Sequence, residues 1–291
     1  MSELTLAPIA ARPDSIAQYR DLLHQGFPEN KAAFTDDYLS WLYLRNPDGQ
    51  VFGFDAWNGS RLVAHYATVP IMATIRSETG PALLSLNTAT HPEFQGRGLF
   101  TKLASATYDA AAQQGFRAVV GVANANSTPG FVRKLDFQLV EPLRAMVGVG
   151  PLRIDQRLAV SEASDFVRNW RAETARWRAS CPDRPIFGAG SSQQRLSLAA
   201  RSNLPGVTAW AERPVEQGWP VTRALALRHL GPRIYLGLAP DAALRRNLYV
   251  NIPTQLRPVP LNFIYRPLVP SAPKTIERGR VLFDFLDFDA F

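Results

Sequence analysis

The stretch Leu86-Asn-Thr-Ala-Thr-His-Pro-Glu-Phe-Gln-Gly-Arg-Gly-Leu-Phe-Thr-Lys-Leu103 decides the fold of the first half of the chain. It has the pattern of a β-strand, a turn that contains a proline, and an amphipathic helix that begins at Gly98. Glycines in such a turn let backbone amides approach a ligand, because no Cβ stands in the way. The free N–H groups of the first helical turn and the positive end of the helix dipole then favour an anion. The stretch therefore predicts an anion-binding turn, with Arg97 adding positive charge at its rim.

The segments around this turn alternate between strand and helix patterns. The expected strands are 4–9, 51–57, 61–75, 82–90, 118–123 and 137–142, and the expected helices are 14–23, 35–44, 98–114 and 126–135. Asn58-Gly59 predicts a hairpin turn, and Gly115 predicts a helix C-cap. This order indicates an α/β protein of the α+β type, with a mixed, mostly antiparallel sheet flanked by helices.

The turn resembles the acyl-CoA-binding motif of the GNAT superfamily of N-acyltransferases. That motif is Gln or Arg, two residues, Gly, one residue, then Gly or Ala; Gln95 and Gly98 match it, and Phe100 stands where Gly or Ala is usual. Leu135-Asp136-Phe137 resembles a second signature, which usually reads Leu-Gly-Phe. The order of elements from Leu4 to Pro142 is also similar to that of the superfamily. The resemblance implies acetyl-CoA as co-substrate and no metal.

The resemblance also implies where CoA is held. Backbone groups of the strand before the turn would contact the pantetheine arm, the amides of the turn would bind the pyrophosphate, and the thioester would lie in a gap beside the next strand. The residues expected at the cofactor are Thr88, Ala89, Thr90, Gln95, Gly96, Arg97, Gly98, Leu99, Phe100, Asn124, Asn126 and Ser127.

The usual catalytic side chains of the superfamily are absent from their expected positions. A tyrosine acid is frequent there, but the corresponding position is Val132, and the glutamate of the strand before the turn falls near Leu84. Three polar residues within reach are candidates for catalysis: Asn87, His91 and Tyr66. Each also fits a structural role, respectively as a hydrogen-bonding strand residue, an exposed turn histidine and a core tyrosine.

The second half of the chain differs in charge and pattern. We expect a GNAT-like domain at 1–150 and a second α/β lobe at 151–291; the first carries a net charge of −1 and the second of +8. The basic half is either a solvated surface or a wall that attracts an anionic acceptor. Helical patterns at 164–178 lead into an expected linker or lid at 182–190. Strand-like runs follow at 208–211, 223–230, 233–238, 248–252, 263–265 and 281–285.

A faint internal echo leaves open whether the second lobe is a degenerate GNAT-like repeat. The run from Trp41 through Pro47 to Phe52 has a counterpart in the run from Trp177 through Pro182 to Phe187.

Several classes of protein are disfavoured by composition. No run of about 18 apolar residues is present, so we expect no membrane span. The start of the sequence lacks a signal-peptide pattern, which indicates a cytoplasmic protein. The single Cys181 and four histidines without ligand spacing predict no metal. The sequence does not indicate an oligomeric state.

The expected activity is transfer of an acetyl or other acyl group from its CoA thioester to the primary amine of a small acceptor. The charge of the second half makes an anionic acceptor, such as an amino sugar, the leading candidate. The alternatives are an aminoacyl transferase of the related two-lobed type, which uses charged tRNA, and a non-catalytic CoA-binding sensor. Other nucleic-acid binding is disfavoured, because the basic residues are dispersed and not interleaved with aromatic ones.

Overall fold

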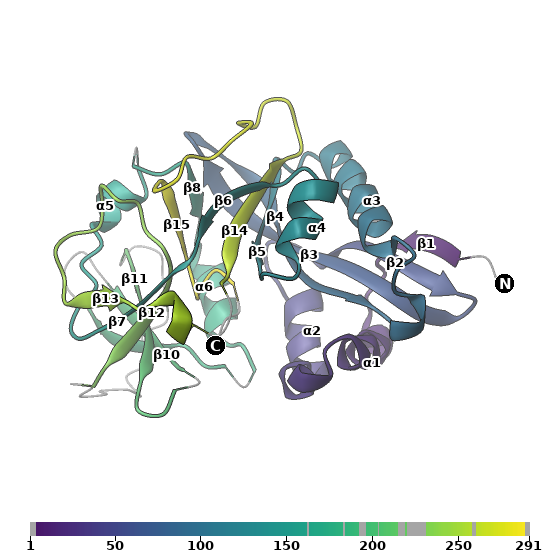
Figure 1. The fold of residues 1–291 in the computed structure, drawn as a ribbon, viewed down its shortest axis with the longest axis horizontal. Helices are drawn as coiled ribbons and strands as arrows, with labels where there is room; N and C mark the ends of the chain where they lie inside the picture. The colour runs from purple at the N-terminus through teal and green to yellow at the C-terminus, as the bar shows by residue number, and fades with distance from the viewer. Residues whose placement is uncertain are drawn as a thin grey trace. The chain divides into compact units, whose positions relative to one another are not determined.

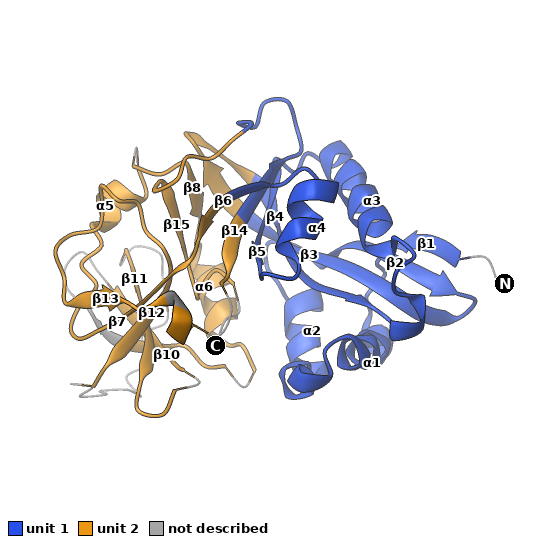
Figure 2. Cartoon of the chain, viewed as in Figure 1, with its two compact units in different colours: residues 1–71, 81–139, 264–274 blue, residues 72–80, 140–263, 275–291 orange. Residues whose placement is uncertain are grey.

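The computed structural model describes residues 4–161, 163–182, 184–191, 196–202, 204–214, 219, 231–257 and 260–288. The chain divides into two compact units (Figures 1 and 2). Unit 1 consists of Met1–Ile71, Pro81–Leu139 and Ile264–Lys274, and unit 2 of Met72–Gly80, Val140–Phe263 and Thr275–Phe291. The sequence-based boundary at residue 150 is a single cut, whereas the chain passes between these units several times.

Unit 1 has the predicted order of helices and strands. Its helices are α1 (Ile16–Gly26), α2 (Asp36–Leu44), α3 (Leu99–Gln113) and α4 (Thr128–Lys134), with short 3₁₀ turns at Pro13–Ser15, Pro28–Ala33 and Pro92–Phe94. Its strands are β1 (Leu4–Pro8), β2 (Phe52–Asn58) and β5 (Ala118–Ala123), together with most of β3 (Arg61–Ile75) and β4 (Glu78–Thr90). Residues of both units occur in β3, β4, β6 (Gln138–Pro142) and β14 (Asn262–Pro267).

Local signals account for the ends of several of these elements. The β2–β3 hairpin closes on the two-residue loop Gly59-Ser60, one residue later than predicted, and Gly59 has a φ of 61°. Thr35 caps α2 by accepting a hydrogen bond from the Tyr38 amide (3.1 Å). The C-cap of α3 is Gln114, one residue before the predicted Gly115, which follows it with the positive φ (81°) that commonly ends a helix.

The sheet of unit 1 has helices on both faces, with α1 and α2 on one side and α3 on the other (Figure 1). Successive side chains of a strand point to opposite faces of the sheet, so neighbouring residues of β3 contact different helices. The His65 side chain contacts Tyr43 of α2, whereas the Tyr66 hydroxyl lies 2.5 Å from that of Tyr108 on α3. The core on the α3 side is apolar and includes Leu103. The mixed, mostly antiparallel sheet flanked by helices is therefore confirmed.

Unit 2 is built mainly of antiparallel strands. They are β7 (Arg144–Gly148), β8 (Phe166–Arg168), β9 (Phe187–Ser191), β10 (Leu196–Arg201), β11 (Thr208–Arg213), β12 (Arg233–Leu238), β13 (Tyr249–Asn251) and β15 (Val281–Asp284), and its helices are α5 (Gln156–Ala159) and α6 (Ala172–Ala179). The predicted strand at 223–230 lies outside the described residues.

Two predictions for unit 2 were only partly right. The helical pattern at 164–178 is confirmed from Ala172 onward, in α6, but its first part contains a strand, β8, because Phe166 and Val167 pair with β15 and with the tip of the β3–β4 hairpin. The expected linker or lid at 182–190 contains β9, which pairs with β10. In both cases pairing with residues distant in the sequence outweighs the local pattern.

Unit 2 repeats part of the strand order of unit 1. After α2, the consecutive strands β2, β3 and β4 lie side by side, and β4 pairs in parallel with β5; after α6, the strands β9, β10 and β11 lie side by side, and β11 pairs in parallel with β12. Trp41 of α2 and Trp177 of α6 are both buried, and Phe52 and Phe187 each begin the strand that follows. The two similar runs of sequence therefore lie on corresponding elements, α2–β2 and α6–β9, as a degenerate repeat requires.

No helix in the described part of the chain is long and apolar enough to cross a membrane.

Candidate functional site

The candidate site lies in unit 1, where β4 and β5 separate. The two strands pair in parallel at Leu83–Val119, Leu84–Val120 and Ser85–Gly121, and both continue beyond the last of these pairs. From Ser85 onward, β4 lines a cavity of about 720 Å³ together with the turn after β4 and parts of α3 and α4. Asn87 lies at this point with a φ of 44°, which interrupts the regular strand.

Most of the residues predicted from the sequence line this one cavity. They are Asn87, Thr88, Ala89, Thr90, Gln95, Gly96, Gly98, Leu99, Phe100, Asn124, Asn126 and Ser127. The sequence interpretation did not include several further lining residues: Gly26, Phe27, Ser85, Leu86, Phe94, Thr101, Val122, Gly130, Phe131 and Lys134.

The turn after β4 has the geometry of an anion site. Gly96 and Gly98 have φ values of 75° and 71°, and a Cβ at either position would meet no heavy atom within 4 Å. The first backbone bond of α3 runs from the Lys102 amide to the Gly98 carbonyl (3.1 Å). The amides of Leu99, Phe100 and Thr101 precede this bond, so they are the N–H groups that an α-helix leaves without an intrahelical partner. All three residues line the cavity, and the helix dipole adds positive potential there.

Arg97 does not line the cavity, although it was predicted at the cofactor. Its guanidinium lies 4.7 Å from the centre of the Phe94 ring and donates to the Glu93 carbonyl (3.1 Å). The Arg97 side chain therefore stabilises the turn. Lys134, in the last turn of α4, supplies a cation to the cavity lining. The sequence near Lys134 does not indicate that this residue lines the cavity, because only the packing of α4 brings it there.

Phe100 stands where the acyl-CoA motif usually has Gly or Ala, and a glycine on α4 leaves room for its larger side chain. The Phe100 ring packs edge-on against Phe131, with 5.2 Å between centroids. A Cβ at Gly130 would lie 3.2 Å from Phe100 Cε1, which is tighter than ordinary contact. The missing side chain at Gly130 thus provides room for the bulky residue of the motif. Asp136, which replaces the glycine of the second signature, adopts a φ of 54°, a conformation that aspartate tolerates better than most residues.

The Asn124 side chain shapes the turn that precedes α4. Its Oδ1 accepts hydrogen bonds from the amides of Asn126 (3.0 Å) and Ser127 (2.9 Å), and its carbonyl accepts from the Thr128 amide (2.9 Å). Asn124 therefore positions the other two lining residues of this turn.

The three catalytic candidates occupy different environments. Asn87 lines the cavity. Tyr66 is fully buried, its hydroxyl lies 2.9 Å from Ser85 Oγ, and burial raises the pKa of Tyr66 to about 12. His91 lines a second pocket, and its Nε2 lies 2.5 Å from the Arg61 guanidinium. Because a guanidinium can only donate, this nitrogen already serves as an acceptor.

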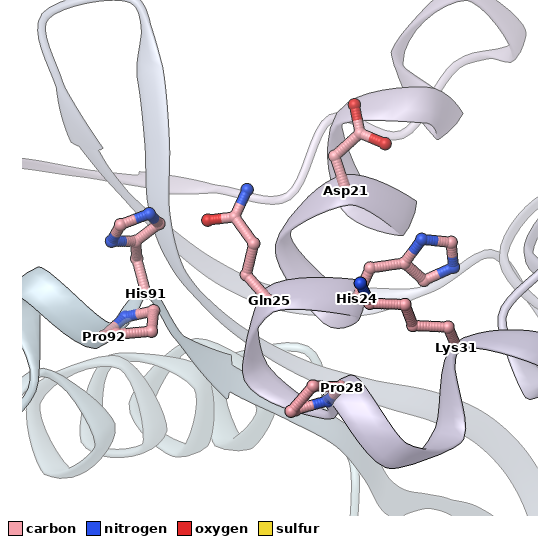
Figure 3. A pocket seen from close by; sticks show the side chains of 7 residues that line it. All are labelled: Asp21, His24, Gln25, Pro28, Lys31, His91 and Pro92. Atoms are coloured by element: carbon pink, nitrogen blue, oxygen red, sulfur yellow. The ribbon is translucent and has the colours of Figure 1, made fainter.

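The second pocket has a volume of about 500 Å³, and Figure 3 shows the side chains that line it. It is lined by Asp21, His24, Gln25, Pro28, Lys31, His91 and Pro92. Gly26, which lines the first cavity, packs on Ala89 of β4, where a Cβ on the glycine would lie 3.1 Å from that of the alanine. In the described residues there is no cluster of three or more His, Cys, Asp or Glu side chains that could hold a metal.

The parallel pair of β4 and β5, which opens over the N-terminus of α3, is the strand–turn–helix arrangement of an α+β domain that the sequence predicted. Residues 8–140 match the family model of the acetyltransferase (GNAT) domain, so the chain carries a GNAT domain over this segment, with an additional C-terminal lobe. No curated protein matches the chain.

Solved structures share the fold over nearly the whole chain. A GCN5-related N-acetyltransferase from Anabaena variabilis ATCC 29413 is similar with a TM-score of 0.58 and 10% identity, covering 91% of this chain and 73% of that one. Eis1 from Mycobacterium abscessus is similar with a TM-score of 0.57 and 10% identity, over 91% and 74%. A tandem GNAT protein from the clavulanic acid biosynthesis pathway has a TM-score of 0.53 and 13% identity, over 92% and 100%. At these identities the likeness concerns the fold alone.

Proposed function

We propose that unit 1 binds an acyl-CoA, with acetyl-CoA as the leading candidate, and transfers the acyl group to a primary amine. The observation that carries this proposal is the anion turn of Gly96 and Gly98, which opens onto the same cavity as the end of β4. A pyrophosphate fits the N-terminus of α3, and Lys134 adds a charge for phosphate. The elongated pantetheine arm would then follow β4 toward Asn87.

The chemistry requires few protein groups. The lone pair of a neutral amine attacks the thioester carbonyl carbon, the C–N bond forms, and the C–S bond breaks in the tetrahedral intermediate. The sulfur leaves as a thiolate that takes a proton, and the nitrogen loses one to water. Positioning of the two reactants supplies much of the rate enhancement in such a reaction. Hydrogen-bond donors near the carbonyl oxygen would add to it.

We further propose a small anionic acceptor, with an amino sugar as the leading example. The net charge of +8 over residues 151–291 supports this, because a basic surface raises the local concentration of an anion. This proposal treats the second lobe as the part that recognises the acceptor, while the GNAT domain recognises the donor.

The donor site can be tested by thermal unfolding with a matched pair of variants. CoA at about 100 times its Kd should stabilise the protein by roughly 2.7 kcal/mol. Gly98→Glu should abolish this shift, because it places a side chain and a negative charge at the pyrophosphate. Gly115→Glu is the control: it also has a positive φ and open space for Cβ, but it lies at the other end of α3. Equal loss of CoA binding in both variants would refute the site.

Catalysis is tested separately, by following thiol release from acetyl-CoA with a panel of amines that includes neutral and phosphorylated amino sugars. Turnover with an amine confirms the transferase. Stabilisation by CoA without any turnover would favour the CoA-binding sensor instead.

A further inference from the structure

A chain of buried polar side chains runs through unit 1 to the wall of the CoA cavity. His65 Nδ1 lies 2.6 Å from Asp55 Oδ1, the Tyr43 hydroxyl lies 2.9 Å from His65 Nε2, and Asn87 Nδ2 lies 3.3 Å from the Tyr43 hydroxyl. Asp55, His65 and Tyr43 are at most 1% exposed. Burying three such groups is costly unless each is hydrogen-bonded, and here each has its partners.

The chemistry of Asp55 sets the direction of the first hydrogen bond, and the tautomer of His65 sets the direction of the next. The Asp55 carboxylate can only accept, and its second oxygen accepts from the Tyr19 hydroxyl (3.0 Å). His65 Nδ1 must therefore carry a proton, and with this as the single proton of the ring, Nε2 is an acceptor. Burial raises the pKa of Tyr43 well above its usual range, so its hydroxyl keeps its proton and donates to Nε2.

This direction determines the orientation of the Asn87 amide. Since the proton of the Tyr43 hydroxyl is used toward His65, its oxygen accepts from the Asn87 NH₂ group. The carbonyl oxygen of Asn87 is thereby left for a ligand in the cavity that this residue lines. The φ of 44° places Asn87 where β4 departs from regular pairing, next to the path that we propose for the thioester.

We propose that Asp55, His65 and Tyr43 act as a positioning relay that orients Asn87, so that its carbonyl oxygen accepts an N–H hydrogen bond from the acceptor amine. The inference rests on the proposed transferase function. Asn87 contacts the substrate, and the other three residues act through it. The hydrogen bond holds the amine nitrogen in place and disperses the positive charge it gains as the C–N bond forms. An amide is not a base, so the proton itself leaves to water.

A double-mutant cycle tests the relay. Asn87→Gly removes the side chain while tolerating the positive φ, and Tyr43→Phe removes a single hydroxyl. Each should lower kcat/KM for the amine about tenfold or more, and neither should change the stabilisation by CoA. The double variant should be no slower than Asn87→Gly, because Tyr43 acts only through Asn87.

The control is Tyr265→Phe, which removes another buried hydroxyl of the same unit, one that donates to the Pro273 carbonyl (2.7 Å). It should leave kcat/KM for the amine within about twofold of the wild type. Additive losses in the double variant, or an equal loss in Tyr265→Phe, would overturn the proposal.

A second measurement does not depend on turnover or on the stability of a variant. The ¹⁵N spectrum of the wild-type imidazoles should show His65 as the neutral tautomer with the proton on Nδ1. A proton on Nε2 would reverse the chain, turn the Asn87 NH₂ group toward the cavity, and overturn the proposal. If no amine is acetylated but the predicted tautomer is found, the transferase function fails while the assigned orientation of Asn87 stands.

Discussion

Phe100 of α3 packs into the space left by a glycine on α4, because a Cβ at Gly130 would stand 3.2 Å from Phe100 Cε1. Both residues line the cavity that we assign to CoA. Phe100, which stands where the motif usually has Gly or Ala, and Gly130 on α4 are therefore complementary in size.

Gly130→Val should weaken CoA binding about tenfold or more, since the added side chain displaces the Phe100 ring into the cavity. Isothermal titration with CoA measures this. Adding Phe100→Ala, which restores the residue usual in the motif, should recover most of the affinity. A double variant as weak as Gly130→Val would show that the two residues do not act together.

Lys134→Glu should lower the affinity for CoA by several-fold at low ionic strength, with the difference shrinking as salt is added. The physical reason is that Lys134 lines the cavity and its charge is partly screened by solvent. Lys102→Glu is the matched control, because Lys102 is an exposed lysine of α3 that does not line the cavity. Equal effects of the two variants would mean that only the net charge of the domain matters.

Arg213→Met should destabilise the protein by about 3–5 kcal/mol, because it leaves two buried carboxylates without their cation. Arg213 Nη1 lies 2.6 Å from Asp284 and its Nη2 lies 2.9 Å from Asp287, and all three side chains are at most 2% exposed. Urea unfolding provides the measurement.

The comparison for this variant is Arg245→Met, which breaks the exposed pair with Asp155 (2.8 Å) and should cost less than about 1 kcal/mol. A similarly small loss for Arg213→Met would contradict the structural role of the buried cluster.

Reversing exposed arginines of the second half, as in Arg246→Glu with Arg278→Glu, should raise the KM for an anionic acceptor several-fold and make it less sensitive to salt. Both residues are exposed, and the Arg278 side chain is 81% accessible. Steady-state kinetics at two ionic strengths measures the effect, and the stabilisation by CoA should not change. Arg12→Glu, an exposed arginine of the first half, should leave KM unaltered. Weaker CoA binding with an unchanged KM would reverse the roles assigned to the two halves.

The amino-acid sequence alone determined the anion turn and the order of elements in the GNAT domain. These depend on local physics: glycines at positive φ, capping residues, and apolar residues at the period of a helix or a strand. The turn from Gln95 to Gly98 has the features of an anion site within a few residues, so these features could be recognised without a fold. The same holds for the helix cap at Thr35.

Only the tertiary structure decided which distant residues meet. β8 and β9 are strands because of partners far away in the sequence, although their local patterns favoured a helix and a linker. Lys134 reaches the cavity, and Arg97 does not, because of how α4 and Phe94 pack. Asn87 and Tyr43 are separated by 44 positions, and their contact depends on α2 packing against the face of the sheet that His65 points to. Hydrogen bonds of this kind have no period in the sequence, so they follow from packing alone.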